Sequence, residues 1–524
     1  MITTMSKISG NLWFISQDFE PSTCVGQVDW LETARDSQCL TMPIVSSIFV
    51  DLAQQVGRLN WEFPQMFGWF TPSCPIELRD KVWVEQRLPW LFERFGTQRI
   101  LSLPRVLPTR EFFPESYLGS PDDLPTLLGR ICQYMGADSG RFELSLFSED
   151  EQPNALGLYQ KEEGDRPRIW LKETLLPDQE AVIATLSHEV AHDLLLGAGL
   201  VSGDEPDHEH LTDLLPVVLG MGTFHANTAI KQDSWNAGNM SYWTIRRSGY
   251  LTASVCGYAM GVIEWLRGST SPPSVAYLGA DAAGAMRSGH RYLLKTADCL
   301  IDRNRPERLM ATLTAEPLEL IANGSSSQCL FILAGWLTNE TLTSAQIDAA
   351  LKSLRRKEPV IQSTAIEVLE KVDPPSNLVI DSILELLHSP HDSVRARATM
   401  ATTVLRLPLE HVLIEGNRLL DELMWLIKGP DPETALAAAV VFGSHGNSAI
   451  KAVPNILSLL VAALTRHSDS TDALFHALWQ IVGNVKAYLD EHPGMLMEGQ
   501  NQLIREGLRS WQVPNGGEAA TKPG

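Results

Sequence analysis

The sequence predicts an α+β part, built from a small antiparallel sheet and a long helix, followed by an all-α solenoid of paired helices. Three short strand-like runs lie between residues 142 and 173, and a helical pattern follows them from Pro177. From about residue 305 one helical pattern follows another with short connectors. Segments there repeat in steps of 39 and 38 residues, which is the size of a two-helix repeat unit.

A chain of 524 residues is too long for one hydrophobic core, so several domains are expected. We expect an α+β domain at residues 76–304, with its core at about 140–265, and helical repeats at 305–511. The region 1–75 is rich in Trp and Phe but has no chemical motif, and it stays unassigned. The tail 512–524 is predicted to be disordered.

The composition excludes several classes of protein. A formal net charge of −21 argues against a general nucleic-acid binder, because such proteins hold phosphates with clustered Lys and Arg. Seven cysteines are scattered singly, which is typical of reduced thiols. The amino-terminal sequence has no signal-peptide core, and the longest apolar run, 450–465, contains Lys451 and Pro454 and is too short to span a bilayer. We expect a cytoplasmic protein without nucleic-acid or membrane partners.

The first elements of the α+β part are helical patterns at residues 76–140, which we interpret as packing surface for the sheet and the long helix. Strand-like runs come next at residues 142–147, 155–160 and 168–173. The last two are joined by the turn-rich stretch KEEGDRP, which predicts a hairpin and hence an antiparallel sheet.

The next helix carries the stretch HEVAH at residues 188–192. Pro177 stands at a favoured first-turn position, with acidic residues near the positive end of the helix, and glycines after residue 196 end it. His188 and His192 are four residues apart, so both imidazoles project from one helix face and can reach one metal ion. Glu189 lies beside them. The pattern is typical of a zinc peptidase.

A catalytic zinc site needs three protein ligands and one open position, so a third ligand must come from elsewhere. The segment DEPDHEHLTD, residues 204–213, is acidic, rich in histidine and followed by a helical pattern. Glu209 and Asp213 are four residues apart there. Several neighbours could serve as the third ligand in place of Glu209, namely Glu205, Asp207, His208 and His210. We interpret the two histidines among them as surface residues.

The two segments together resemble the gluzincin superfamily of thermolysin-like zinc metallopeptidases, and the similarity covers about residues 140–265. The resemblance implies that His188, His192 and Glu209 are the zinc ligands and that Glu189 is the general base. It also implies that Asp213 accepts a hydrogen bond from a ligand histidine. The order of elements, three strands followed by the motif helix and a second helix, is similar to the minimal catalytic core of that superfamily. This smaller form resembles bacterial proteins, and the resemblance to them implies no particular substrate.

A zinc ion in such a site lowers the pKa of its bound water towards about 7, and Glu189 would accept the proton and pass it to the leaving amine. We expect the strand RIWLKE at residues 168–173 to pair with an extended peptide at the edge of the sheet. Four residues are candidates to stabilise the developing oxyanion, although a structural polar role is favoured for each: His225, Tyr242, Tyr250 and Tyr258.

The carboxyl-terminal repeats are similar to HEAT-type repeats over about residues 350–490. Asp392, Asp431 and Asp469 occupy matching positions, where each is expected to cap the second helix of its unit. The small residues Ala398 and Ala438 are expected to let neighbouring helices pack closely. An ordinary helical bundle is the alternative.

Two functional hypotheses follow. The first is a zinc peptidase whose helical repeats recruit a protein substrate or regulator. The second is an adaptor in which the metallopeptidase fold survives only as a scaffold for protein-binding repeats. All polar positions of the site are intact, which favours the enzyme. A zinc hydrolase acting on something other than a peptide shares the same metal chemistry and stays open.

Overall fold

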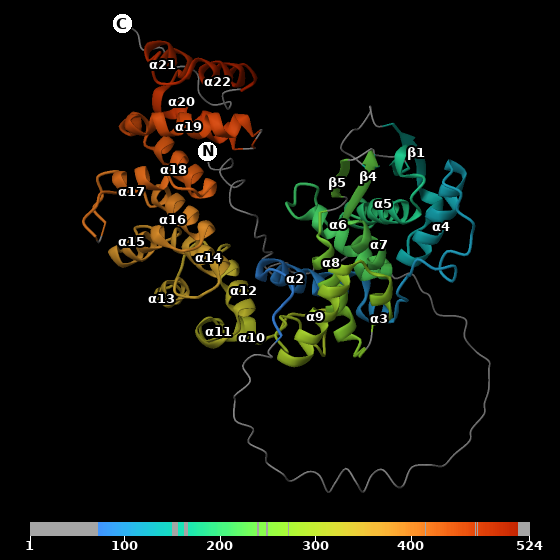
Figure 1. Ribbon diagram of the computed structural model, residues 1–524. Coiled ribbons are helices and arrows are strands. Elements are labelled where there is room, and N and C mark those ends of the chain that lie inside the picture. Colours follow the sequence, from blue (N-terminus) through green and yellow to red (C-terminus); the bar gives the residue numbers. More distant parts are fainter. Residues whose placement is uncertain are drawn as a thin grey trace, which may run out of the picture. The chain divides into compact units, whose positions relative to one another are not determined.

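The computed structural model describes residues 72–511, with gaps at residues 149–155, 162–165, 238–239, 248–249, 271, 414, 467 and 469. The unassigned region before residue 72 and the tail predicted to be disordered lie outside the described residues, as do the side chains of residues 230–249. The described chain is mostly helical and contains a three-stranded and a two-stranded sheet (Figure 1).

The first part of the described chain contains α2 (Leu78–Phe95), α3 (Thr97–Ser102), α4 (Leu124–Met135), β1 (Glu143–Phe147), β2 (Gly157–Gln160), β3 (Arg168–Lys172), α5 (Gln179–His192), α6 (His208–Pro216), α7 (Gly222–Thr228), β4 (Ile230–Ala237), β5 (Met240–Arg247), α8 (Ala253–Leu266) and α9 (Ala280–Thr296). The second part contains α10 (Thr312–Ala315), α11 (Pro317–Asn323), α12 (Ser326–Trp336), α13 (Ser344–Ser353), α14 (Pro359–Leu369), α15 (Asn377–Leu384), α16 (Asp392–Val404), α17 (Leu419–Leu426), α18 (Pro432–Ser444), α19 (Val453–Thr465), α20 (Thr471–Val482), α21 (Val485–Glu491) and α22 (Glu498–Ser510).

The three-stranded sheet is mixed, in the order β1-β3-β2. β2 pairs with β3 antiparallel, as the hairpin predicts, but β1 pairs with β3 in parallel, so the prediction of an antiparallel sheet is wrong for that pair. The most buried strand, β3, takes the centre, with Ile169 and Leu171 fully buried. An alternating apolar pattern specifies the buried face of a strand but not its neighbours or its direction.

The strand order also corrects the predicted peptide-binding edge. β3, which contains RIWLK, has a neighbour on both sides and is not an edge strand. β2 is an outer strand, and it packs against α5, the helix that carries HEVAH. The edge beside the motif is therefore that of β2.

The motif lies on a helix, as predicted, with a small change at its start. Asp178 is the N-cap of α5, and its carboxylate accepts a hydrogen bond of 3.1 Å from the backbone N–H of Ala181. Pro177 therefore stands just before the helix rather than in its first turn. A π-helical turn at Asp193–Gly197 ends the helix beyond His192.

The second helix of the motif, α6, begins at His208 and ends at Pro216, where a π-helical turn continues the chain to Met221. Pro216 has no backbone N–H to donate within a regular helix, which accounts for a change of helix type here. Glu209 lies in the first turn and Asp213 one turn further on.

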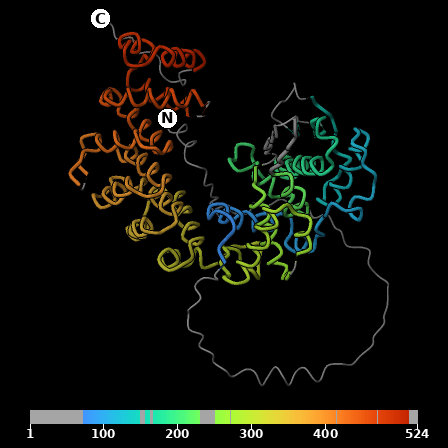
Figure 2. Tube along the Cα trace, viewed as in Figure 1, coloured from blue at the N-terminus to red at the C-terminus, as the bar shows by residue number. Residues whose placement is uncertain are grey.

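Buried apolar side chains form two cores. The first contains residues between Val84 and Ile301, and the second contains residues between Leu300 and Ile504 together with Val82 of α2. The trace in Figure 2 runs from blue to yellow-green through the first core and from yellow to red through the second. Helix α2 contributes side chains to both.

In the second core α14, α16, α18 and α20 pack each against the next, as Figure 1 shows. Ala398 and Ala438 are fully buried, as the repeat pattern predicts. Asp431 caps α18 by accepting from the backbone N–H of Glu433 and Thr434. Asp392 is instead the first residue of α16 and caps nothing, so that prediction is wrong, and Asp469 lies outside the described residues.

The apolar stretch near residue 450 is longer than its sequence indicates, because a 3₁₀ turn joins α19. The resulting helical segment, Gly446–Thr465, has 20 residues and a mean hydropathy of 1.6, so length and composition alone would let it cross a membrane. Its residues Ile456, Leu457 and Leu460 are fully buried in the second core. Core helices of this length have the same composition, so the segment is weak evidence for a membrane.

Candidate metal centre

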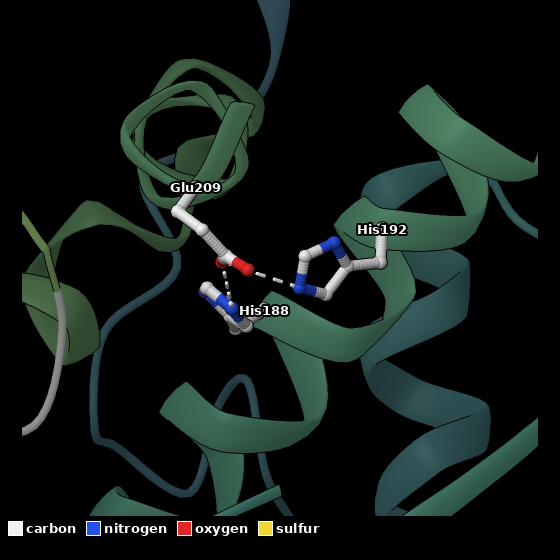
Figure 3. A group of neighbouring side chains, drawn as sticks. All are labelled: His188, His192 and Glu209. Atoms are coloured by element: carbon white, nitrogen blue, oxygen red, sulfur yellow. Dashed lines mark ion pairs between the residues drawn. The ribbon is translucent and has the colours of Figure 1, made fainter. Parts of the chain in front are cut away.

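Three side chains that the sequence singles out converge in the structure. Helix α5 places His188 and His192 on one face, and α6 brings Glu209 over them (Figure 3). Nε2 of each histidine lies 3.4 Å from Oε2 of Glu209. The three ligand atoms lie within 4.8 Å of one another, close enough to share one metal ion.

The donor set fits a divalent metal. In a tetrahedral site with bonds of about 2.0–2.1 Å, neighbouring ligand atoms are about 3.3 Å apart, which matches both His–Glu209 distances. Oε2 of Glu209 is buried and has no hydrogen-bond partner among the described residues. A buried carboxylate oxygen is costly unless a cation or donor satisfies it, and a metal at the shared point would do so.

The orientation of His188 is set by its other ring nitrogen. Nδ1 lies 2.8 Å from Oδ1 of Asp213, and Oδ2 of Asp213 accepts from the backbone N–H of Tyr250 at 2.6 Å and of Leu251 at 2.9 Å. The carboxylate, fixed on both oxygens, therefore keeps a proton on Nδ1 and directs Nε2 towards Glu209. Asp213 thus lies where the resemblance places it.

Replacing Asp213 with Asn is expected to weaken metal binding by about 10–100-fold without loss of fold. The amide NH₂ must face either the Nδ1–H of His188 or the two backbone N–H groups of Tyr250 and Leu251. In either orientation an N–H donor of the new amide meets at least one other N–H donor, and that hydrogen bond is lost. Chelator competition measures the affinity. Asp431→Asn, at the helix cap of α18, is the matched control and should bind metal as the wild type does. An unchanged affinity in Asp213→Asn would remove this residue from the site.

The second histidine has partners that the sequence does not reveal. Nδ1 of His192 lies 3.4 Å from the hydroxyl of Thr212, and its ring stacks on Tyr159 at a centroid distance of 6.0 Å. Tyr159, from β2, donates to Oδ1 of the buried Asp193 at 2.9 Å. Tyr159 is separated from His192 by a turn, strand β3 and helix α5, so no local pattern pairs them.

Burial and the neighbouring charged groups shift the pKa values of His188 and Glu209 in opposite directions. Burial lowers the pKa of His188, but the hydrogen bond to Asp213 and the nearby carboxylate of Glu209 outweigh it and raise that pKa to about 10. Burial raises the pKa of Glu209, but the nearby imidazoles of His188 and His192 overcome it and hold that pKa below its usual range. Without a metal the cluster therefore binds a proton, which a metal ion must displace.

Glu189 lies between His188 and His192 in sequence, but it is not part of the metal-binding group. Its side chain is buried and lines the pocket beside them, and burial raises its pKa to about 7. A carboxylate with a pKa in this range can both accept and return a proton near neutral pH.

Gly157 of the outer strand β2 lies close beside this carboxylate. A Cβ atom at Gly157 would lie 2.4 Å from Oε1 of Glu189 and 2.6 Å from Cγ2 of Thr185. Only glycine lets β2 approach the motif helix this closely.

Gly157→Ala is therefore expected to displace Glu189 or the strand and to lower hydrolysis about 10–100-fold, because misplacement of reacting groups by about 1 Å has effects of this size. The metal content should not change, since no ligand contacts the new methyl group. Turnover and metal content measured on one preparation test this. Gly284→Ala, on α9 with open space around the glycine, is the control. Full activity in Gly157→Ala would contradict the close packing.

The acidic alternatives to Glu209 are occupied elsewhere. Both oxygens of Asp207 pair with Arg87, at 2.6 and 2.7 Å, and Trp83 donates to one of them at 2.8 Å. Oε1 of Glu205 accepts from the backbone N–H of Ser202 at 3.2 Å. Neither side chain belongs to the metal-binding group.

The two neighbouring histidines border the same pocket without joining the ligand set. Nδ1 of His208 lies 2.7 Å from the carbonyl oxygen of Glu205, and its Nε2 lies 3.2 Å from Oε1 of Glu209. His210 is exposed, as a surface residue is expected to be, and lies beside the rings of Trp83 and Tyr250.

The candidates for oxyanion stabilisation differ in whether they line the pocket. His225 is buried and lies 2.9 Å from the hydroxyl of Ser187, but it still lines the pocket. Tyr250 lines the pocket and stacks on the ring of His188. Tyr258 is fully buried and donates to Glu85, away from the pocket, and the side chain of Tyr242 lies outside the described residues.

The pocket that contains the cluster has a volume of about 790 Å³. Its walls come from β2, α5, α6, α7 and the segment before α8, with Leu156, Leu158, Ala184, Thr185, Leu196 and Thr228 among the residues around the polar centre. A peptide segment or a small molecule could enter a pocket of this size.

No protein-family model matches this chain, and no curated protein matches it either.

Proposed function

We propose that this chain is a zinc-dependent peptidase in which His188, His192 and Glu209 hold the metal. The observation that carries the proposal is the convergence of two imidazole nitrogens and an otherwise unsatisfied carboxylate oxygen beside the buried Glu189. Two imidazoles and one carboxylate with an open fourth position form a donor set typical of catalytic zinc.

The chemistry at this site would be divided between the metal and Glu189. A bound zinc ion supplies a water of lowered pKa and polarises the substrate carbonyl. Glu189, buried beside the metal-binding group, would accept the proton of that water. The same carboxyl group then returns the proton to the leaving amine, so the residue ends the cycle in its starting state.

The outer strand β2 is suited to hold an extended peptide across the site. The backbone N–H of Lys172 donates to Leu156 O, so in the antiparallel β2–β3 pair Leu158 faces β3 and the backbone groups of Gly157 and Tyr159 point the other way. A substrate strand could pair with them. The same residues border the pocket beside Glu189 and His192.

We further propose that α12 to α20 form HEAT-like repeats that recruit a protein substrate or regulator. The side-by-side packing of α14, α16, α18 and α20 supports repeats, as do the buried small residues between them. The net charge of −21 favours a protein rather than a nucleic acid as partner. A cytoplasmic location remains part of this proposal.

A scaffold without activity is the second candidate. A fold kept only for protein binding has no need of a buried carboxylate next to a metal-binding group, and both are present here. A hydrolase of non-peptide substrates shares this metal chemistry, but the exposed edge of β2 favours a peptide.

Zinc content and proteolysis measured on one preparation of the full chain test the proposal. We expect about one zinc per chain and cleavage of peptides from a mixed library, both abolished by a chelator and restored by zinc. Cleavage that persists in metal-free protein, or zinc-loaded protein that cuts no peptide, would contradict it.

A further inference from the structure

Helix α2 lies far from the motif in sequence but contacts the segment that carries the third ligand. Trp83 and Arg87 are four residues apart on one face of α2. Arg87 holds both oxygens of Asp207 at 2.6 and 2.7 Å, and Trp83 Nε1 donates to Asp207 Oδ2 at 2.8 Å. Arg87 and Asp207 are only 3% and 4% exposed.

Asp207 immediately precedes α6, and Glu209 follows two residues later. With a rise of about 1.5 Å per residue, the fixed carboxylate lies within one helical turn of the ligand. A bidentate Arg–carboxylate pair fixes direction as well as distance. The contact therefore fixes the rotation of the first turn of α6, and with it the direction in which Glu209 projects.

A different face of α2 is anchored by a second buried network. Lys81 bonds Glu85 on the same helix and the hydroxyl of Ser327 on α12, at 2.8 Å. Glu85 in turn accepts from the hydroxyl of Tyr258 on α8 and from the backbone N–H of Leu300. Lys81 and Glu85 are 1% and 0% exposed, so the helix is bonded on two faces by buried charges.

Buried ion pairs are a poor source of stability, because the desolvation of both charges offsets most of their attraction. Apolar side chains of similar volume would hold α2 in the core equally well. Directional bonds differ from apolar contacts in one respect, because they specify a single orientation of the groups that they join. The arrangement is therefore better suited to positioning α6 than to stabilising the fold.

We propose that α2 is a brace for the metal site, in which Arg87 and Trp83 act through Asp207 as positioning residues for the ligand Glu209. This inference rests on the metal site of the proposed function. It adds three residues, none of which belongs to the metal-binding group or lines the pocket. Arg87 and Trp83 come from a helix more than 100 positions earlier in the chain.

The test uses full-length variants and zinc affinity from chelator competition. Arg87→Met should weaken zinc binding by about 10–100-fold, the range observed when outer groups that orient metal ligands are lost. The absorption spectrum of the cobalt-substituted protein should change as well, because it reports the ligand geometry. Trp83→Phe removes one hydrogen bond and keeps an aromatic ring, and should weaken zinc binding measurably, by up to about tenfold, and shift the cobalt spectrum.

A double variant separates positioning from stability. Arg87→Met with Asp207→Leu replaces the ion pair by apolar groups, so the free energy of unfolding should recover. Zinc affinity should stay at least about tenfold weaker, because no directional contact remains. Arg105→Met is the control, since it breaks another Arg–carboxylate pair with two bonds, one of 2.6 Å, to the buried Glu264 on α8, outside the pocket lining. Arg105 is 31% exposed and Glu264 keeps Arg267 as a partner, so the loss of stability should be smaller than in Arg87→Met. Arg105→Met should lower stability and leave zinc affinity unchanged.

Wild-type zinc affinity in folded Arg87→Met, or affinity that recovers with stability in the double variant, overturns the brace. If Arg87→Met does not fold, unchanged affinity and cobalt spectrum in Trp83→Phe overturn it. A wild-type chain that binds no zinc overturns both the brace and the proposed function. A chain that binds zinc through the brace but cuts no peptide leaves the brace standing and removes only the peptidase.

Discussion

Glu189→Gln is expected to lower peptide hydrolysis by about 10²–10⁴-fold, the usual contribution of a general base, while zinc stays bound. Gln keeps the size of the side chain in a site where Glu189 is 3% exposed, so packing should not change. It cannot accept a proton, however, and the carboxylate is the one motif group outside the ligand contacts. The variant should therefore hold its substrate uncut.

Capture of a protein that the wild type cleaves would identify the substrate and support the peptidase. Glu180→Gln is the matched control, because Glu180 lies on the same helix but outside the pocket lining, and its activity should equal that of the wild type. If wild type and Glu189→Gln both contain zinc, bind the same partners equally and cut none of them, catalysis is excluded and the adaptor is the better description.

Much of the site is predictable from sequence because its parts are local. His188 and His192 share a helix face through their spacing, and Glu209 and Asp213 do so on the next helix. The meeting of the two helices is a tertiary contact, and only the resemblance to a known superfamily implies it. The structure brings the ligand atoms of His188, His192 and Glu209 within 4.8 Å of one another, and Asp213 bonds His188 from behind.

The rest of the site depends on contacts between residues far apart in the chain, which no local sequence pattern predicts. Arg87 is indistinguishable in sequence from a surface arginine on an amphipathic helix, yet it binds Asp207 across 120 positions. Gly157 resembles an ordinary loop or strand glycine until the approach of Glu189 is known. The order of the sheet is hidden for the same reason, because an alternating pattern specifies one buried face and leaves register and neighbours open.

The wild-type chain is expected to retain one zinc per molecule, and a His188→Ala, His192→Ala double variant is expected to retain none. The double variant keeps only Glu209 of the three ligands, and a single carboxylate does not hold zinc at low concentration. The cysteines of the described chain cannot substitute, because none of them lines the pocket. Metal analysis after exhaustive dialysis measures the difference.

The fold should survive this change, since α5 and α6 are anchored by fully buried residues such as Val190 and Leu214 rather than by the ligands. Added zinc should raise the melting temperature of the metal-free wild type, because a ligand that binds only the folded state stabilises it, and should leave the double variant unaffected. His208→Ala with His210→Ala is the matched control: both residues border the pocket outside the ligand set, so zinc should remain stoichiometric. Zinc retained without His188 and His192 but lost without His208 and His210 would move the metal to the start of α6 and overturn the ligand assignment.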